Sequence, residues 1–323
     1  MQYTPRRLRL EKQKKKEGIK RQIGRILIVF LIVAGMGALL KQAHSLVMLS
    51  KAKSIVVEYG TLEHVISTQA VVARYEQVYT CPITGRIQVV AKEEERVSEG
   101  ALIAKIKGEG SSATAEMPEE NIYAQKAGIV SYKLDGLEQI ITPETIRNLK
   151  AESVYEQAKN AESKVAANQQ VVPSGTGFVK IVNNLKPVIL EFSLSKDAWK
   201  GVPETGDVFT FRLAGEIEAR SGQAVEVIRN STGYRILAEV RDWPQQLLTE
   251  RLVEMEVLVE SFEGIVVPQS AIITIDGVQG VYKVTTNRYV FKPVEIIGQV
   301  GESAVVSGLE AGDEILLESA RLK

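Results

Sequence analysis

The hydrophobic pattern divides the chain into two parts. Residues 26–40 form an uncharged apolar run that shows no alternation and no polar face. From about residue 54 onward, short segments alternate apolar and polar positions between Gly, Asn and Asp turns, for example at 85–90, 254–260 and 280–285. A period of two together with many β-branched residues is typical of strands. The pattern therefore predicts one apolar helix followed by a mainly β protein.

The apolar run favours a single transmembrane helix over residues 23–40. Fifteen helical residues from Ile26 to Leu40 span only about 22 Å, so the span is extended back to Ile23, with Arg25 and Lys41 snorkelling at its ends. Ten Lys and Arg residues lie between Arg6 and Arg25, before the apolar run, and three follow it closely. This bias predicts a cytoplasmic amino terminus and an extracytoplasmic bulk, hence a single-pass protein of the cytoplasmic (inner) membrane.

Two alternatives to an anchor exist for this run. A cleaved signal peptide has the same order of charged and apolar regions, but the sequence after the run, Lys-Gln-Ala-His-Ser, is a poor cleavage site. A short buried core helix is disfavoured because no polar residue interrupts the run. An uncleaved anchor is the favoured interpretation.

The charge distribution supports membrane contact rather than nucleic-acid binding. The net charge is zero, yet residues 1–50 hold eleven basic and two acidic residues, a local charge of +9 that leaves −9 for the rest. A basic segment directly beside an apolar span suits anionic lipid headgroups. Lipid is therefore the expected partner of this tail, and no nucleic-acid partner is expected.

One helical segment interrupts the β pattern, from Thr142 to about Asn168. Thr142, Pro143 and Glu144 make a typical helix start, with a capping hydroxyl, a first-turn proline and an acid at the positive end of the helix dipole. The apolar positions that follow form two short stripes. We expect two short helices with a break near Lys150.

An internal repeat organises the region before and after these helices. Residues 97–106 and 172–181 share the pattern Val-x-x-Gly-x-x-apolar-apolar-Lys-Ile, and a Gly-led strand precedes each copy, at Gly85 and Gly128. The spacing from that glycine to the repeat is 12 positions in the first copy and 44 in the second. The difference is about the length of the helical segment. The repeat predicts two related β halves, with a helical insertion at about 138–168 in the second.

These motifs resemble the HlyD-type membrane fusion proteins, the periplasmic adaptor subunits of efflux transporters, in the subgroup related to resistance-nodulation-division (RND) adaptors. The two halves are similar to the lipoyl-like barrel-sandwich hybrid of that family. The segment Gly264–Ile272 is similar to the one that leaves the β-barrel, and residues 276–282 and 308–313 resemble the membrane-proximal domain. The amino-terminal anchor is also as the family has it.

The resemblance implies a modular order of domains along the chain. The expected domains are a basic cytoplasmic tail at 1–22, a transmembrane helix at 23–40, a linker with the first strand at 41–60, a barrel-sandwich hybrid at 61–187, a β-barrel at 188–263 and a membrane-proximal β domain at 264–323.

The link between the two halves departs from the family pattern. Members that dock an outer-membrane duct carry a long coiled-coil hairpin there, whereas residues 107–123 are only 17 positions rich in Gly, Ser and Glu. Direct docking to a TolC-like duct is therefore not expected. A cell without an outer membrane, or a divergent subgroup, fits this link better.

The sequence offers no constellation for catalysis. A single cysteine, Cys81, and two histidines, His44 and His64, are too few for a zinc or iron site. Neither a phosphate-binding loop nor a Gly-x-Ser-x-Gly elbow is present. We predict no catalytic, cofactor-binding or metal site and no cofactor, and therefore no enzyme.

Individual residues have structural interpretations. Lys107 lacks the setting of a lipoyl or biotinyl lysine and is expected in a solvated loop. His64 is expected at the surface, Cys81 in the interior, and Glu93 with its two acidic neighbours in a solvated turn. The two tryptophans, Trp199 and Trp243, are expected to pack in or at the rim of the barrel.

The leading hypothesis is a membrane-anchored adaptor of an efflux or export transporter that catalyses nothing. Its expected partner is an inner-membrane transporter, of ABC or RND type, and the resemblance implies a homo-oligomer. The alternative is a cell-envelope scaffold or assembly protein that binds wall polymers or division proteins. A secreted enzyme is disfavoured because no nucleophile–base or metal constellation is present.

Overall fold

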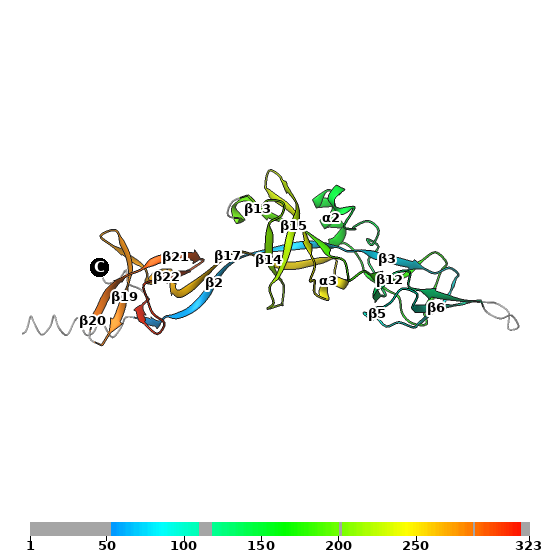
Figure 1. Cartoon of the computed structure of the whole chain (residues 1–323), viewed down its shortest axis with the longest axis horizontal. Coiled ribbons are helices and arrows are strands. Elements are labelled where there is room, and N and C mark those ends of the chain that lie inside the picture. Colours follow the sequence, from blue (N-terminus) through cyan, green and yellow to red (C-terminus); the bar gives the residue numbers. More distant parts are fainter. Residues whose placement is uncertain (1–52, 110–117, 200–201, 287, 318–323) are drawn as a thin grey trace, which may run out of the picture. The chain divides into compact units, whose positions relative to one another are not determined.

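The computed structural model describes residues 53–109, 118–199, 202–286 and 288–317. Antiparallel strands dominate these residues (Figure 1), which confirms the predicted mainly β class. They form two compact units, Glu63–Ser261 and the described parts of Met1–Leu62 and Phe262–Lys323 together. The predicted tail and transmembrane helix lie outside the described residues, and among the described residues no helix has the length and apolar character needed to cross a membrane.

Eight strands of the Glu63–Ser261 unit form a sandwich of two four-stranded sheets. One sheet has the order β11-β4-β6-β7 and the other β3-β12-β8-β5. Their bounds are β3 (Glu76–Thr80), β4 (Gly85–Val89), β5 (Arg96–Val97), β6 (Leu102–Gly108), β7 (Glu119–Tyr123), β8 (Gly128–Ser131), β11 (Val171–Val172) and β12 (Gly177–Val182).

The pairing of these strands follows the sequence repeat. The first half consists of β3, β4, β5 and β6, and the second of β7, β8, β11 and β12. In each half, the first and the third strand pair with strands of the other half. The short third strands show the symmetry, because Val97 pairs with Gly128 while its repeat partner Val172 pairs with Gly85. The predicted two-half sandwich is therefore confirmed, and neither half can form its sheet alone.

Gly85 and Gly128 occupy equivalent places where two strands approach closely. A Cβ atom added to Gly85 would lie 2.5 Å from the carbonyl oxygen of Lys107, and one on Gly128 would meet the carbonyl oxygen of Val182 in the same way. Real Cβ atoms do not come so close to backbone, so the strands would have to move apart. Steric crowding therefore explains why glycine leads the strand in both copies of the repeat.

We expect Gly85→Ala to lower the free energy of unfolding of the sandwich by about 1–3 kcal/mol, because an added methyl group in a packed site forces backbone shifts. Hydrogen exchange of the β4 and β6 amides in the full chain would measure the loss. The matched control is Gly60→Ala, whose Cβ would make an ordinary 3.4 Å contact with Val266 Cγ2. Equal exchange in both variants would contradict the steric argument.

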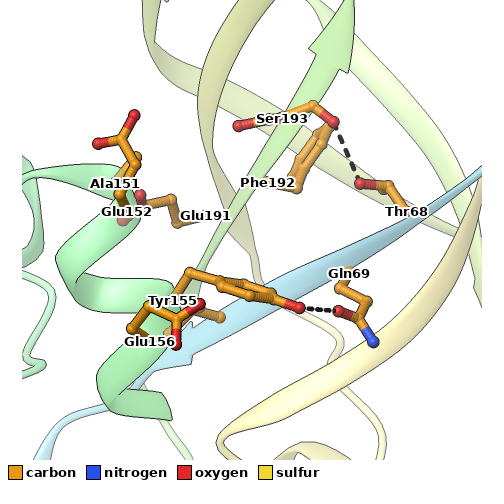
Figure 2. Close-up of a pocket in the computed structure, with 10 residues that line it drawn as sticks. Thr68, Gln69, Ala151, Glu152, Tyr155, Glu156, Glu191, Phe192 and Ser193 are labelled. Carbon is orange, nitrogen blue, oxygen red and sulfur yellow. Dashed lines mark hydrogen bonds between the residues drawn. The ribbon is translucent and has the colours of Figure 1, made fainter. Parts of the chain in front are cut away.

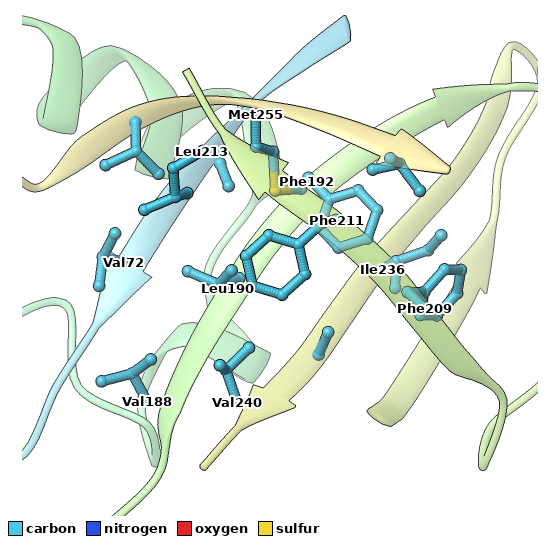
Figure 3. Close-up of a cluster of buried hydrophobic side chains, with 14 of the residues drawn as sticks. Val72, Val188, Leu190, Phe192, Phe209, Phe211, Leu213, Ile236, Val240 and Met255 are labelled. Atoms are coloured by element: carbon cyan, nitrogen blue, oxygen red, sulfur yellow. The ribbon is translucent and has the colours of Figure 1, made fainter. Parts of the chain in front are cut away.

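Six strands of the same unit form a closed barrel. The sheet order β14-β15-β16-β13-β2-β17 closes because β14 also pairs with β17. The bounds are β2 (Glu58–Ala73), β13 (Val188–Ser195), β14 (Val208–Leu213), β15 (Arg220–Arg229), β16 (Gly233–Val240) and β17 (Leu252–Pro268), with a short η2 (Lys196–Ala198) and α3 (Gln246–Thr249) between strands. Apolar side chains fill its interior (Figure 3), where the rings of Phe192 and Phe209 meet edge to face at 5.7 Å.

The structure places β2 in this barrel rather than in the sandwich. Residues Ala70–Ala73 pair with β13, while the sandwich begins only with β3 at Glu76. The expected sandwich domain at 61–187 therefore includes, at its start, a strand that the structure gives to the barrel. The sequence pattern of β2 identifies a strand but not its neighbours, because pairing partners lie more than 100 residues away.

The helical insertion packs on the outer face of the barrel. Its neck is the pairing of β9 (Lys133–Leu134) with β10 (Lys164–Val165), and it contains η1 (Ile146–Asn148) and α2 (Ala151–Lys159). Lys150 between them is extended, which confirms the break there. The helix start expected at Thr142 is wrong, because the first element is a single 3-10 turn that begins at Ile146, and the helical part ends at Lys159 rather than near Asn168. Insertion residues Ile146 and Val154 share a buried cluster with barrel residues Ile189 and Leu237.

Alternation along the barrel strands explains this packing. Val72, Leu190 and Ile236 point into the barrel, whereas Ile189 and Leu237, one position away, point outward to the insertion. The inward face of β13 is therefore apolar throughout, whereas its outward face has Ile189 against the insertion, followed by Glu191 and Ser193.

The second unit is a smaller β domain built from both ends of the described chain. β1 (Ser54–Val56) pairs with β23 (Glu314–Leu316), so the expected first strand joins the carboxy-terminal domain. The other elements are η3 (Gln269–Ala271), β18 (Ile273–Ile275), β19 (Val278–Thr285), β20 (Arg288–Pro293), β21 (Glu295–Val300) and β22 (Ser303–Ser307). Asp276 and Gly277 have φ of 50° and 82° and form the two-residue turn from β18 to β19.

Candidate functional site

A buried ion-pair network lies where the sandwich, the insertion and the barrel meet within the Glu63–Ser261 unit. We call it the junction network; its members are Arg74, Glu76, Asp135, Glu138, Lys180 and Arg251. No member's side chain is more than 9% exposed. Charged groups are seldom buried to this degree unless they are paired, so the pairing within the network is decisive.

Glu76, the first residue of β3, is the centre of the network. Its Oε1 accepts from Arg74 Nε at 3.1 Å and lies 2.8 Å from Lys180 Nζ. Its Oε2 accepts from Arg251 Nη2 at 2.7 Å. One carboxylate thus contacts three cations that come from three different stretches of chain.

Two further carboxylates, from the neck of the insertion, balance the cations. Arg251 Nε donates to Asp135 Oδ2 at 2.8 Å, and Lys180 Nζ donates to Glu138 Oε1 at 3.2 Å. The Leu137 amide donates to Asp135 Oδ1 at 2.8 Å. Three acids and three bases leave the cluster neutral, which is the condition under which buried charge is tolerated.

The two arginines also hold the backbone at the end of the barrel. Arg74 Nη1 donates to the carbonyl oxygens of Leu247 and Glu250, both at 2.7 Å, and Arg251 Nη1 donates to that of Val72 at 3.1 Å. The network therefore ties barrel backbone, insertion and sandwich into one body. Its hydrogen bonds and ion pairs hold these three modules against one another.

The network shifts the pKa values of its acids. Burial alone would raise the pKa of Glu76, but the charges of Arg74, Arg251 and Lys180 outweigh burial and lower it to about 2. The pKa of Asp135 is likewise lowered to about 2, because its pairing with Arg251 outweighs burial. Both groups are therefore ionised at any ordinary pH.

Acid should loosen the junction in a defined window. Because the folded-state pKa of Glu76 lies below its ordinary value of 4.5, its ion pairs contribute full stability above about pH 4.5, and this contribution is lost as the pH falls toward 2. Thermal unfolding of the full chain across that range should show a falling Tm. Glu76→Gln should flatten the dependence; an equally steep decline in that variant would contradict the assignment.

The repeat contains a second, exposed copy of the central pair. Lys105 occupies the place of Lys180 in the repeat and pairs with Glu119 of β7, as Lys180 pairs with Glu76 of β3, with N–O distances of 2.8 Å in both. In both copies the lysine lies opposite the residue two positions after the glutamate. The lysine that both copies of the repeat share is the signal in the sequence for this pair.

The residues singled out from sequence occupy mainly structural positions. Cys81 is 1% exposed, and burial raises the pKa of its thiol to about 11, so it stays neutral. Trp199 packs on Phe209 in the barrel, with ring centroids 5.1 Å apart, and Trp243 Nε1 donates to the Lys186 carbonyl at 3.1 Å.

Two expectations need correction. Glu93 is half-buried and accepts hydrogen bonds from Ser131 Oγ and the Tyr132 amide at 2.8 and 2.6 Å, so it fastens its turn to β8 rather than lying in solvent. Lys107 is exposed as expected, but it does not lie in a loop. It is a residue of strand β6, where its backbone lies opposite that of Glu119 in β7. His64 is a half-buried residue of β2. Among the described residues no group of three or more acids, His or Cys could hold a metal ion.

Residues 76–183 match the family model for the RND-related barrel-sandwich hybrid domain. This match confirms the barrel-sandwich hybrid domain that the repeat predicted. The matched residues comprise the two four-stranded sheets and the helical insertion.

Solved structures match the chain at low sequence identity. ZneB from Cupriavidus metallidurans matches at 14% identity over 84% of this chain and 94% of its own, with a TM-score of 0.32. MacA from Actinobacillus actinomycetemcomitans matches at 15% identity over 82% and 99%, with a TM-score of 0.36. The membrane fusion protein Spr0693 from Streptococcus pneumoniae matches at 16% identity over 60% and 100%, with a TM-score of 0.29. No curated protein matches the sequence.

Proposed function

We propose that this chain is the membrane-anchored adaptor subunit of an efflux or export transporter and that it catalyses no reaction. The observation that carries the proposal is the barrel-sandwich hybrid domain at residues 76–183, joined to a barrel by the buried junction network. An adaptor has to pass a conformational change from one module to the next. A neutral, buried and multiply bonded junction suits that task, because it resists bending without any chemistry.

The proposed topology follows from the sequence. Residues 23–40 would cross the inner membrane, with the basic tail in the cytoplasm and the β domains outside. An ABC or RND transporter would be the partner, and several copies of the chain would assemble around it. Direct docking to a TolC-like duct is not part of the proposal, because residues 107–123 are too short for a long coiled-coil hairpin.

Photocrosslinking in native membranes tests the proposal. The full chain would carry a crosslinking amino acid at the exposed Val290 of the carboxy-terminal β domain, with the exposed Glu99 of the sandwich as the control position. We expect a polytopic transporter as the main product from position 290 and less of it from position 99. Recovery of only wall-synthesis or division proteins would overturn the proposal and favour an envelope scaffold.

A further inference from the structure

A pocket of about 430 Å³ lies between helix α2 of the insertion and barrel strands β2 and β13 (Figure 2). Three carboxylates line it: Glu152 and Glu156 from α2, and Glu191 from β13. Neither Lys, Arg nor His is among its lining residues. Two cations lie beside the lining: Arg235 Nε is 2.8 Å from Glu191 Oε1, and Lys159 Nζ is 5.8 Å from the centroid of the Tyr155 ring.

Glu191 is a buried acid with one oxygen unused. It is 5% exposed, and its Oε1 accepts from Arg235 Nε at 2.8 Å. Its Oε2 makes no hydrogen bond, although both oxygens of a carboxylate normally find donors when buried. Arg235 is also engaged with the insertion, where its Nη2 donates to the Ile146 carbonyl at 2.9 Å. An unsatisfied buried acceptor is costly, so a donor that reaches it binds with a gain.

The same pocket has an apolar side. Val71, which is 3% exposed, and the Tyr155 ring contribute apolar surface. Phe192 also lines the pocket, but its ring lies in the barrel interior against Phe209. The Tyr155 hydroxyl donates to Gln69 Oε1 at 2.6 Å, which holds that ring across the pocket (Figure 2). Convergent acceptors beside apolar walls are the usual composition of a small-molecule site, and the volume lies in the usual range.

We propose that this pocket binds a small organic cation, whose ammonium or guanidinium group donates to Glu191 and is flanked by Glu152 and Glu156, and whose apolar body lies on Val71 and Tyr155. The proposal rests on the acidic lining, the unused buried oxygen and the apolar wall together. It does not depend on the adaptor role.

Calorimetric titration with 4-phenylbutylammonium, using the full chain in lipid nanodiscs and subtracting empty nanodiscs, tests the proposal. We expect saturable binding to the wild type and at least about tenfold weaker binding of the neutral analogue 4-phenylbutanol, because charge-assisted hydrogen bonds are lost. The double variant Glu152→Gln/Glu156→Gln, which alters two exposed side chains, should weaken ammonium binding about tenfold, and Glu191→Gln at least as much.

Two controls keep the result interpretable. Glu99→Gln removes one charge from an exposed site in the sandwich and should leave the affinity within about twofold. The exposed Ser193 lines the pocket, so Ser193→Trp should block it sterically without disturbing a core. Absence of saturable ammonium binding, equal binding of the alcohol, or unchanged affinity in the double variant and in Ser193→Trp would each overturn the proposal. A chain that binds the ammonium but crosslinks to no transporter would support this site and contradict the adaptor role.

Discussion

Replacing Glu76 with glutamine is expected to destabilise the Glu63–Ser261 unit by about 3–5 kcal/mol, the usual cost of breaking a buried ion pair from one side. The substitution is nearly isosteric, so packing is retained while Arg74, Lys180 and Arg251 face one fewer negative charge. Their remaining acids, Asp135 and Glu138, cannot neutralise three buried cations. Hydrogen exchange of β3 and β12 amides in the full chain would measure the loss.

The matched control for this variant is Glu119→Gln, which breaks the repeat-related pair with Lys105. That pair has the same geometry, but its side chains are 33% and 39% exposed. Water screens it, so we expect no measurable change in unfolding temperature. If both variants behave alike, the burial of the junction network is not what stabilises the unit. A double-mutant cycle of Glu76→Gln with Lys180→Met would then apportion the pair energy.

Phe178→Ala is expected to cost about 3–5 kcal/mol, because it leaves a cavity in the centre of the sandwich. Phe178 is fully buried in the core of the sandwich. Its repeat equivalent in the other half, Ile103, belongs to the same core. Ile103→Ala should therefore cost about 2–5 kcal/mol and should accelerate amide exchange in β12 as well as in β6.

The control for the core variants is Tyr123→Ala, which removes an aromatic side chain that is 51% exposed on β7. Its effect on the unfolding free energy should be much smaller than that of Phe178→Ala. If amide hydrogen exchange rises only in the half that contains the substitution, the two halves are independent. That result would contradict a single core shared by both halves.

Local patterns predicted the parts of the molecule that depend on neighbouring residues. The period of two located the strands, and the sequence predicted the break at Lys150 between two short helical elements, Ile146–Asn148 and Ala151–Lys159, although it placed the first start too early, at Thr142. The repeat predicted more, because an approximate symmetry in sequence implies the same pairing twice. It therefore anticipated a non-local result, the sandwich that residues 76–183 form.

The pairing of distant segments could not be obtained in this way. β2 has the alternation of any half-buried strand, and its place in the barrel depends on β13, more than 100 residues later. The insertion interrupts the sandwich in sequence yet packs on the barrel, because outward-facing Ile189 and Leu237 supply an apolar surface there. Local propensity contains no information about such partners.

By itself the sequence determined the β class, the two-half sandwich, the helical insertion and the absence of any recognisable catalytic motif, since these follow from periodicity, repetition and residue type. Only the tertiary structure decided which charges are buried. Lys105 and Lys180 occupy the same repeat position, and one lies at the surface while the other is held among Glu76 and Glu138. The physical reason is that burial, and with it the strength of an ion pair, depends on what packs over a residue, and here the barrel and the insertion cover only one end of a symmetric sandwich.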